Sequence, residues 1–146
     1  MKLLIRSFLI VSMLITTTAM ADELIVKPVA ERVWAIVGPL TNRTPENLGN
    51  NATFGLVETD DGVVLIDSGG SYKGAQKIHQ KIKSVTDKPI RYVINSGGQD
   101  HRWFGNDYFS ALGATIISSQ KAREDHETRL VDQIGRLTSL IGDENF

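Results

Sequence analysis

From residue 31 onward, the apolar positions form short runs typical of strands and longer periodic stretches typical of helices. β-Branched and aromatic residues gather in five short segments bounded by Gly, Pro, Asp or Asn, which predicts strands. Apolar residues recur every three to four positions after Gly70 and again from about Gln120, which predicts two helices, and a shorter helix ends at Gly113. The predicted strands are 31–37, 52–58, 63–66, 90–94 and 115–118, and the predicted helices lie between 70 and 87, over 106–112 and over 120–141.

The order of these segments predicts the fold class. An antiparallel run with a turn at Asp60-Asp61-Gly62 comes first, and strands alternate with helices afterwards. We therefore expect an α+β fold with a mixed, mostly antiparallel sheet and helices on one face. Strand 63–66 has four consecutive apolar residues, which is typical of a strand covered on both faces. No segment of the sequence covers the second face, so we expect missing chain or self-association to cover it.

The first 21 residues have the pattern of a cleavable signal peptide. Lys2 and Arg6 precede an almost wholly apolar run from Ser7 to Ile15, which is shorter than the about 20 residues needed to span a bilayer. Ala19-Met20-Ala21 supplies the small side chains of a cleavage site. We expect cleavage after Ala21, export to a bacterial periplasm and no stable membrane anchor afterwards; an uncleaved anchor is the alternative. Residues 22–146 would then form one partial domain.

The composition excludes several kinds of site and partner. The 146 residues include no cysteine, which excludes disulfides, thiolate-bound metals and a cysteine nucleophile. The formal net charge is −1, and the mature chain becomes more acidic because the signal peptide carries two of the cations. No Lys/Arg-rich run follows the signal peptide, so nucleic acid is not an expected partner.

Polar residues gather where two of the predicted strands end. Asp67 follows strand 63–66, and a loop from Asn95 to Asn106 follows strand 90–94. Ligand sites in open sheets form where loops leave strand ends, so we expect both segments at one edge of the sheet. The loop reads Asn-Ser-Gly-Gly-Gln-Asp-His-Arg-Trp-Phe-Gly-Asn, and its glycines would let the backbone approach a ligand closely. Its composition equally allows a solvated turn in which Arg102 pairs with Asp100.

Several short motifs stand at a characteristic spacing between residues 51 and 117. They are Asn-Ala-Thr-Phe at 51–54, Thr-Asp-Asp-Gly-Val-Val-Leu-Ile-Asp-Ser-Gly at 59–69, Thr-Asp-Lys-Pro-Ile-Arg-Tyr-Val-Ile-Asn at 86–95, Gly105-Asn106, Phe109 and Gly-Ala-Thr-Ile-Ile at 113–117. Together they resemble the N-terminal half of the metallo-β-lactamase superfamily over nearly all of residues 29–141. The resemblance implies half of a four-layer αββα sandwich, with the second sheet and further histidine ligands in later chain. We therefore expect a truncated product or a fragment.

The resemblance implies a His-x-His-x-Asp-His metal motif after Asn95, and this sequence departs from it. Counted without gaps, the two leading histidines fall on Gly97 and Gln99, the aspartate on His101 and the last histidine on Arg102. A one-residue slip instead matches Asp100-His101 to the Asp-His pair. Both alignments lack the leading histidines, so the usual three-histidine zinc site cannot form.

The remaining candidate ligands for one or two zinc ions are His101, Asp100 and Gln99, and they would need further ligands from elsewhere. Asn95 and Trp103 are expected to lie around the site. The resemblance implies that Asp67 supports the metal loop by hydrogen bonding; an ordinary strand-end cap is the alternative.

Two functions follow from the resemblance. In a periplasmic metal-dependent hydrolase, a metal-activated water would attack an ester, amide or lactam carbonyl of a small-molecule substrate. Asp100, His101 and Arg102 would be the catalytic residues: His101 a ligand, Asp100 a ligand or the group that orients the water, and Arg102 a clamp for a substrate carboxylate. This fragment alone would be inactive.

The alternative is a non-catalytic binding protein that reuses the cleft around Gln99, Arg102 and Trp103 for a small anionic ligand. Of the histidines on the predicted helices, His79 is expected to be half-buried and structural, and His126 to be a structural or a surface residue, in either case.

Overall fold

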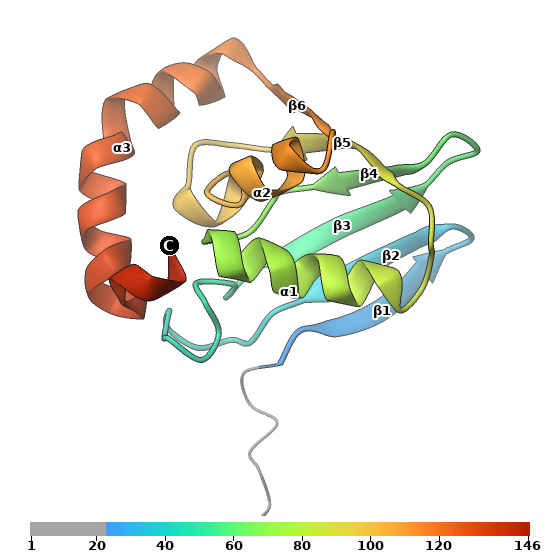
Figure 1. Ribbon diagram of the computed structural model, residues 1–146, viewed down its shortest axis with the longest axis horizontal. Helices are drawn as coiled ribbons and strands as arrows, with labels where there is room; N and C mark the ends of the chain where they lie inside the picture. Colours follow the sequence, from blue (N-terminus) through green and yellow to red (C-terminus); the bar gives the residue numbers. More distant parts are fainter. Residues whose placement is uncertain (1–22) are drawn as a thin grey trace, which may run out of the picture.

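The computed structural model describes residues 23–146, which are built on a single six-stranded sheet (Figure 1). The signal-peptide prediction concerns residues 1–21 and lies outside this range. The first four strands pair antiparallel, and the last three pair parallel. The α+β class and the mixed, mostly antiparallel sheet predicted from the sequence are confirmed. In chain order and in sheet order, the strands are β1 (Ile25–Ala30), β2 (Val33–Val37), β3 (Thr53–Glu58), β4 (Val63–Ile66), β5 (Ile90–Asn95) and β6 (Thr115–Ser118).

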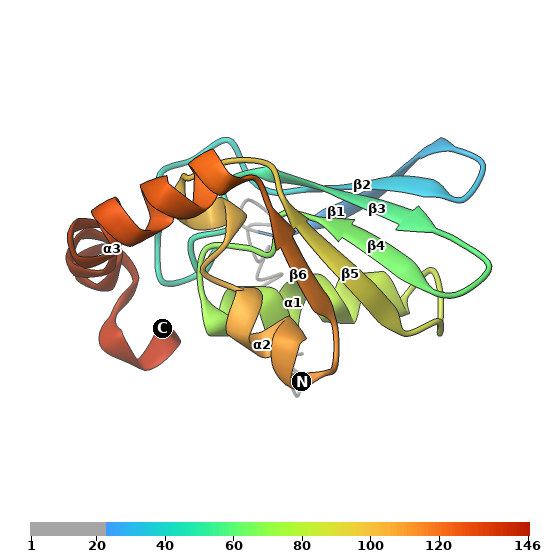
Figure 2. The same ribbon diagram turned by 90° about the horizontal axis from the view of Figure 1, so that it is seen from above.

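Two helices cover one face of the sheet, and a third lies at its end (Figures 1 and 2). The covering helices are α1 (Tyr72–Lys83) and α2 (Asn106–Ala111), and the third is α3 (Gln120–Ile141). Serine hydroxyl groups cap the two longer helices: Ser71 accepts from the Gly74 amide and Ser119 from the Ala122 amide. Short 3₁₀ turns, η2 (Asp100–Arg102) and η3 (Asp143–Asn145), complete the described chain.

Strand β1 was not predicted. The strand predicted at 31–37 is β2, which begins two residues later than predicted, at Val33. Glu31 and Arg32 form the turn of a β1–β2 hairpin, with Arg32 at a φ of 60°. β1 is an exposed edge strand that contains Pro28 and Lys27, so its sequence lacks the apolar alternation of a half-buried strand.

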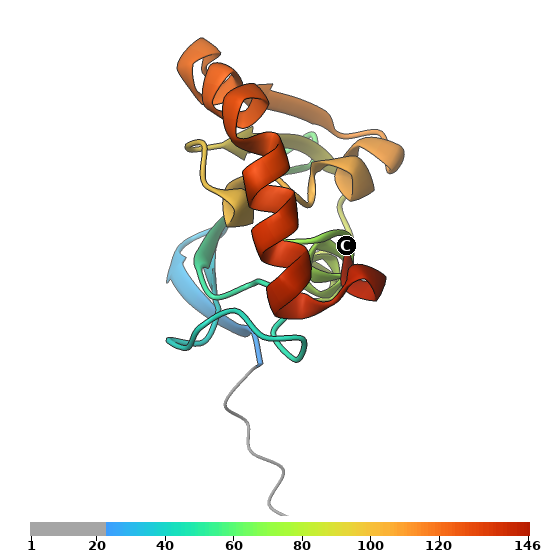
Figure 3. The same ribbon diagram turned by 90° about the vertical axis from the view of Figure 1, so that its left-hand side faces the viewer.

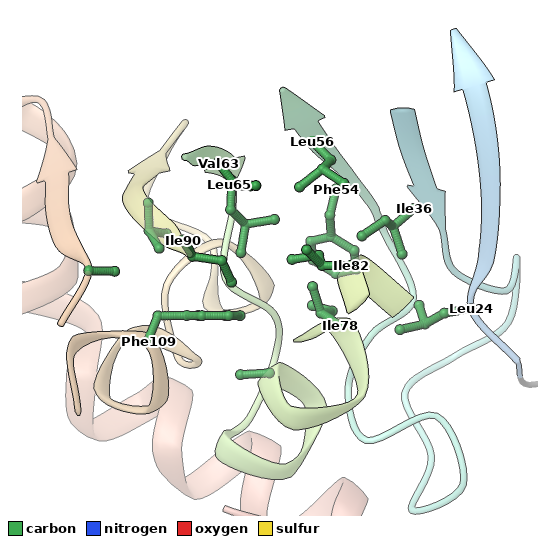
Figure 4. Close-up of a cluster of buried hydrophobic side chains, with 13 residues drawn as sticks. Leu24, Ile36, Phe54, Leu56, Val63, Leu65, Ile78, Ile82, Ile90 and Phe109 are labelled. Atoms are coloured by element: carbon green, nitrogen blue, oxygen red, sulfur yellow. The ribbon is translucent and has the colours of Figure 1, made fainter. Parts of the chain in front are cut away.

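The hydrophobic core lies between the sheet and its two covering helices (Figure 4). Side chains alternate between the faces of each strand, so Leu65 points into the core while Val64 and Ile66 point to the other face. The core joins the sheet to α1 and α2 through Ile36, Phe54, Leu56, Val63, Leu65, Ile90 and Val93 on the strands and Ala75, Ile78, Ile82 and Phe109 on the helices.

We call the opposite side of the sheet the outer face. Val57, Val64 and Ile66 are half-buried there, while Tyr92 is 46% and Ile117 43% exposed. No helix or strand of residues 23–146 is packed over it (Figure 2). The two faces of the same strands therefore bury very different amounts of apolar surface.

In the part of the chain that the structure describes, no helix is both long enough and apolar enough to cross a bilayer.

Substitutions at neighbouring residues of β4 test how tightly the two faces of the sheet are packed. Leu65→Ala should lower the free energy of unfolding by about 2–5 kcal/mol, because it leaves a cavity in the core. Val64→Ala, on the outer face, should cost less than about 1 kcal/mol. Urea denaturation of both variants followed by circular dichroism measures the difference. Equal losses would mean that the outer face is as well packed as the core.

Candidate functional site

The candidate site is built on the edge of the sheet where β4 and β5 end. These neighbouring strands are parallel, so the chain leaves both at the same edge. The Asp67 amide donates to the carbonyl of Ile94 at 2.9 Å, which places the end of β4 beside the end of β5. The sequence-based expectation that Asp67 and the segment after Asn95 share one edge is confirmed. We call residues 96–105 the site loop.

Backbone hydrogen bonds fasten the site loop to the segment after β4. The amides of Ser68 and Gly69 donate to the carbonyls of Arg102 and His101, each at 3.1 Å. The Gly105 amide donates back to the carbonyl of Gly69 at 3.1 Å. A Cβ atom on Gly105 would lie 2.1 Å from the Ser68 carbonyl oxygen, so only glycine permits this approach.

Two buried polar side chains, Asn95 and Asp67, fix both ends of the loop. Asn95 exchanges amide hydrogen bonds with Asn106 at 2.9 and 3.0 Å, and its Nδ2 also donates to the Arg102 carbonyl. Asp67 accepts from the backbone amide of Ser96 at 2.7 Å and from its hydroxyl at 2.8 Å. Asp67 has a φ of 64°, a left-handed conformation that aspartate tolerates better than most residues. These contacts are those of a loop-supporting residue rather than of a simple strand cap.

The Arg102 side chain lies inside the loop. Its Nε donates to Gln99 Oε1 at 2.6 Å, and its Nη1 donates to Asp67 Oδ2 at 3.2 Å and to the Ser96 hydroxyl. A Cβ atom on Gly97 would lie 3.3 Å from Arg102 Cδ, so the arginine fills the space beside that glycine. Arg102 therefore pairs with Asp67, and the predicted alternative in which it pairs with Asp100 is wrong.

Asp100 is a buried carboxylate held by two arginines from distant segments. Its side chain is 1% exposed. Oδ1 accepts from Arg43 Nη2 and from the backbone amide of His101, and Oδ2 accepts from Arg136 Nη2 at 2.6 Å. Arg43 lies between β2 and β3, and Arg136 lies on α3. Asp100 therefore joins three parts of the chain.

Sequence reasoning did not identify either arginine. Arg43 and Arg136 lie 57 and 36 positions from Asp100. Neither belongs to a motif that marks it as a site residue, so only the fold brings them together.

Opposing effects act on the pKa of Asp100, and the stabilising contacts are stronger. Burial raises the pKa, but the hydrogen bond from the His101 backbone amide and the charges of Arg43 and Arg136 lower it, with a net decrease from 3.8 to about 2. Asp100 is therefore ionised throughout the physiological range, and its carboxylate is committed to these donors.

The contact between His101 and Arg43 sets the tautomer of the imidazole. His101 Nδ1 lies 2.9 Å from Arg43 Nη2, and a guanidinium can only donate, so Nδ1 is the acceptor. The distance from Nδ1 to Asp100 Oδ1 is longer, 3.4 Å. A neutral ring then carries its proton on Nε2. With both nitrogens in these states, His101 has no free lone pair to offer a metal ion.

Helix α3 packs against the site loop (Figure 3). His126 Nε2 donates to the carbonyl of Gly97 at 3.0 Å, and its ring stacks on Trp103 with centroids 4.4 Å apart. Gln133 Oε1 accepts from Trp103 Nε1 at 3.2 Å, and Gln133 Nε2 donates to the carbonyl of Gly98 at 2.9 Å. The loop and the helix therefore form one hydrogen-bonded unit.

The buried side of α3 contains polar residues as well as part of the apolar stripe in its sequence. Leu137 and Ile141 are fully buried and Leu130 and Ile134 are each 37% exposed, while the polar residues His126 and Gln133 are buried. The polar groups of the loop need polar partners, and this need accounts for the polar residues that α3 turns inward.

The other sequence-based assignments concern histidines and Trp103. His79 is half-buried, and its Nδ1 lies 2.7 Å from the Tyr108 hydroxyl. Burial, together with the charge of Lys83, lowers the pKa of His79. His79 and His126 both have structural contacts, as predicted. Trp103 lines a cavity of about 350 Å³ beside α3 with Tyr72, Phe104, Asn106, Asp107, Leu130, Ile134 and Phe146.

The residues predicted to bind zinc do not fit a metal in this arrangement. Within residues 23–146, no three His, Asp or Glu side chains gather closely enough to hold an ion. The Asp100 oxygens accept from guanidinium groups, His101 Nδ1 faces Arg43, and Gln99 Oε1 accepts from Arg102. A metal would have to displace positively charged donors from every candidate ligand.

The buried carboxylate should make stability depend on pH. The pKa of Asp100 is lower in the folded than in the unfolded state, so its contribution of about 2 kcal/mol is present above pH 4 and is lost as the pH falls toward 2. Asp100→Asn should remove at least this amount at pH 7 and flatten the acid-dependent loss. Chemical denaturation of the variant between pH 2 and 7 tests this, with the exposed Asp132→Asn as the control. If Asp100→Asn behaves like Asp132→Asn, the arginine contacts contribute no stability.

Comparisons with known proteins agree with this architecture. Three solved metallo-β-lactamases share the fold, each with a TM-score of 0.59. The structure from Pontibacter korlensis is 18% identical, with 74% of this chain and 49% of that chain covered. The structure from Hirschia baltica is 21% identical, with 73% and 48% covered. An enzyme of Pseudomonas aeruginosa in its mono-zinc form is 16% identical, with 74% and 47% covered.

The chain spans about half the length of these solved structures. This extent agrees with a half-fold of one sheet and its covering helices. A family model described as the metallo-beta-lactamase superfamily matches residues 49–141, which include the site loop and the whole of α3. The chain therefore belongs to the metallo-β-lactamase superfamily.

Proposed function

We propose that the protein is a non-catalytic binding protein on the metallo-β-lactamase fold, and that it holds a small carboxylate-bearing ligand at the edge of the sheet. The excess of guanidinium over carboxylate groups at the site supports this proposal. Three arginines, Arg43, Arg102 and Arg136, surround two carboxylates, Asp67 and Asp100. Arginine binds carboxylates through paired N–H donors, so an excess guanidinium favours an anionic ligand.

Arg136 is the guanidinium best placed for a ligand from solution. Its side chain is 55% exposed, whereas that of Arg43 is 16% exposed. Arg136 donates to Asp100 through Nη2, so its Nε and Nη1 can donate to a second carboxylate. His101 lies near Oδ1, the other carboxylate oxygen of Asp100, and its neutral ring carries a proton on Nε2, so it can donate as well. Both residues would bind and orient an anion, and neither would act on it chemically.

Binding can be measured with glutarate as a dicarboxylate probe and uncharged glutaramide as the control ligand. By isothermal titration calorimetry, Arg136→Gln should weaken glutarate binding by about tenfold, and glutaramide should not bind. Asp100→Asn should instead tighten glutarate binding, because it removes the carboxylate that competes for the arginines.

Arg129→Gln is the matched control for Arg136→Gln. Arg129 lies on the same helix, is 47% exposed and also pairs with one aspartate, Asp125. It should leave glutarate affinity within about twofold. Equal losses in the two variants, or no glutarate binding at about 10 mM, would rule out the anion site.

The second candidate function is metal-dependent hydrolysis of a small-molecule ester, amide or lactam by the whole protein. Membership of the superfamily and the position of Asp100 and His101 at the strand-end edge favour it. His101 would first have to release Arg43, and further ligands would come from outside residues 23–146. Zinc-dependent turnover of a lactam or ester by the whole protein, abolished in His101→Ala, would establish this function in place of the first.

We also propose that the protein is exported to the periplasm and that the outer face of its sheet is covered by further chain or by self-association. The mass of protein recovered from the periplasm should correspond to a chain beginning at Asp22. Replacing Ala19 and Ala21 by arginine should block this processing, because signal peptidase requires small side chains there. A periplasmic protein that retains Met1 would contradict the proposal.

A further inference from the structure

We infer that guanidinium groups take the place of a metal ion in this site: Arg102 inside the loop, and Arg43 with Arg136 around Asp100. The inference concerns what holds the site together. It does not depend on whether a small anion binds there.

Arg102 connects the end of β4 to the site loop. Its guanidinium joins Asp67 at the end of β4 to Ser96 and Gln99 in the loop. A planar guanidinium carries five N–H donors in a fixed geometry, so one side chain can satisfy several oxygen acceptors at once. A metal ion would instead need the lone pairs of its ligands directed at one point.

The substitutions in the loop fit one another in space. Gly97, Gln99 and Arg102 stand at the three positions where the ungapped superfamily motif has histidine. A side chain at residue 97 would begin 3.3 Å from Arg102 Cδ, which is tighter than ordinary van der Waals contact. Gln99 supplies an oxygen that accepts from Arg102 at 2.6 Å. Gly97 leaves room for the Arg102 side chain, and Gln99 accepts a hydrogen bond from it. The three residues therefore together take the place of the three histidines.

Arg43 and Arg136 provide the same kind of replacement at the neighbouring carboxylate. Asp100 is fully buried, and a buried carboxylate needs a cation or several hydrogen-bond donors. The two guanidinium groups supply both. A divalent ion added beside them would face three arginines and two carboxylates, so like-charge repulsion would oppose its binding.

The first test asks whether Arg102 holds the loop. Arg102→Met should lower the midpoint of thermal unfolding by about 5 °C, because it leaves Asp67 without its ion pair and Gln99 without its donor. Arg123→Met is the control, since Arg123 forms only an exposed pair with Glu127 on α3. EDTA should leave the wild-type midpoint unchanged. Equal midpoints for the two variants, or a wild-type midpoint lowered by EDTA, would overturn the inference.

The second test restores histidines with and without Arg102. The full chain carrying Gly97→His, Gln99→His and Arg102→His should retain zinc after metal loading and desalting, measured as zinc per chain. The double variant Gly97→His/Gln99→His, which keeps Arg102, should retain much less.

Three results of this second test would overturn the inference. One is equal zinc retention by the double and triple variants. Another is no retention by either, since the loop could then not host the metal that Arg102 is inferred to replace. The third is one zinc per wild-type chain that is lost in His101→Ala.

Discussion

The site depends on one constraint, which is the burial of the Asp100 carboxylate away from water. A buried charge is stable only when nearby groups replace the hydration that it loses. Here the replacement comes from the loop after β2, from α3 and from the backbone of the site loop itself. Because the donors lie far apart in sequence, satisfying this charge fixes the relative positions of three segments.

The packing of α3 follows from the same requirement for polar partners. The carbonyls of Gly97 and Gly98 are satisfied by His126 and Gln133, and this contact turns polar residues of the helix inward. Gly98 is also small enough for α3 to approach, since a Cβ atom there would lie 1.7 Å from Asp125 Oδ2. The apolar residues Leu130 and Ile134 remain partly exposed as a result. Hydrogen bonding to the site loop and the burial of Leu137 and Ile141 together set the rotation of this helix.

The superfamily fold and the chemistry of the site are separable in this protein. The strands and the glycine contact at Gly105 depend on backbone geometry, and the Asp67 carboxylate supports the loop through hydrogen bonds that need no metal. The groups that would bind a metal depend on side chains, and these are engaged with arginines. A fold can thus persist while its site is rebuilt, and for this reason membership of the superfamily does not by itself assign an activity.

The sequence by itself determined the fold class, four of the strands closely, the three helices and the edge of the sheet where polar residues gather. These features depend on local patterns of apolar residues and on the rule that parallel neighbouring strands end at the same edge. It did not reveal β1, because an exposed edge strand containing Pro28 has little apolar alternation. Only the tertiary structure decided that Arg102 pairs with Asp67, that Arg43 and Arg136 meet at Asp100, and that Arg43 sets the tautomer of His101. Such contacts depend on side chains separated by tens of residues, and no local pattern records which of several arginines will reach a buried carboxylate.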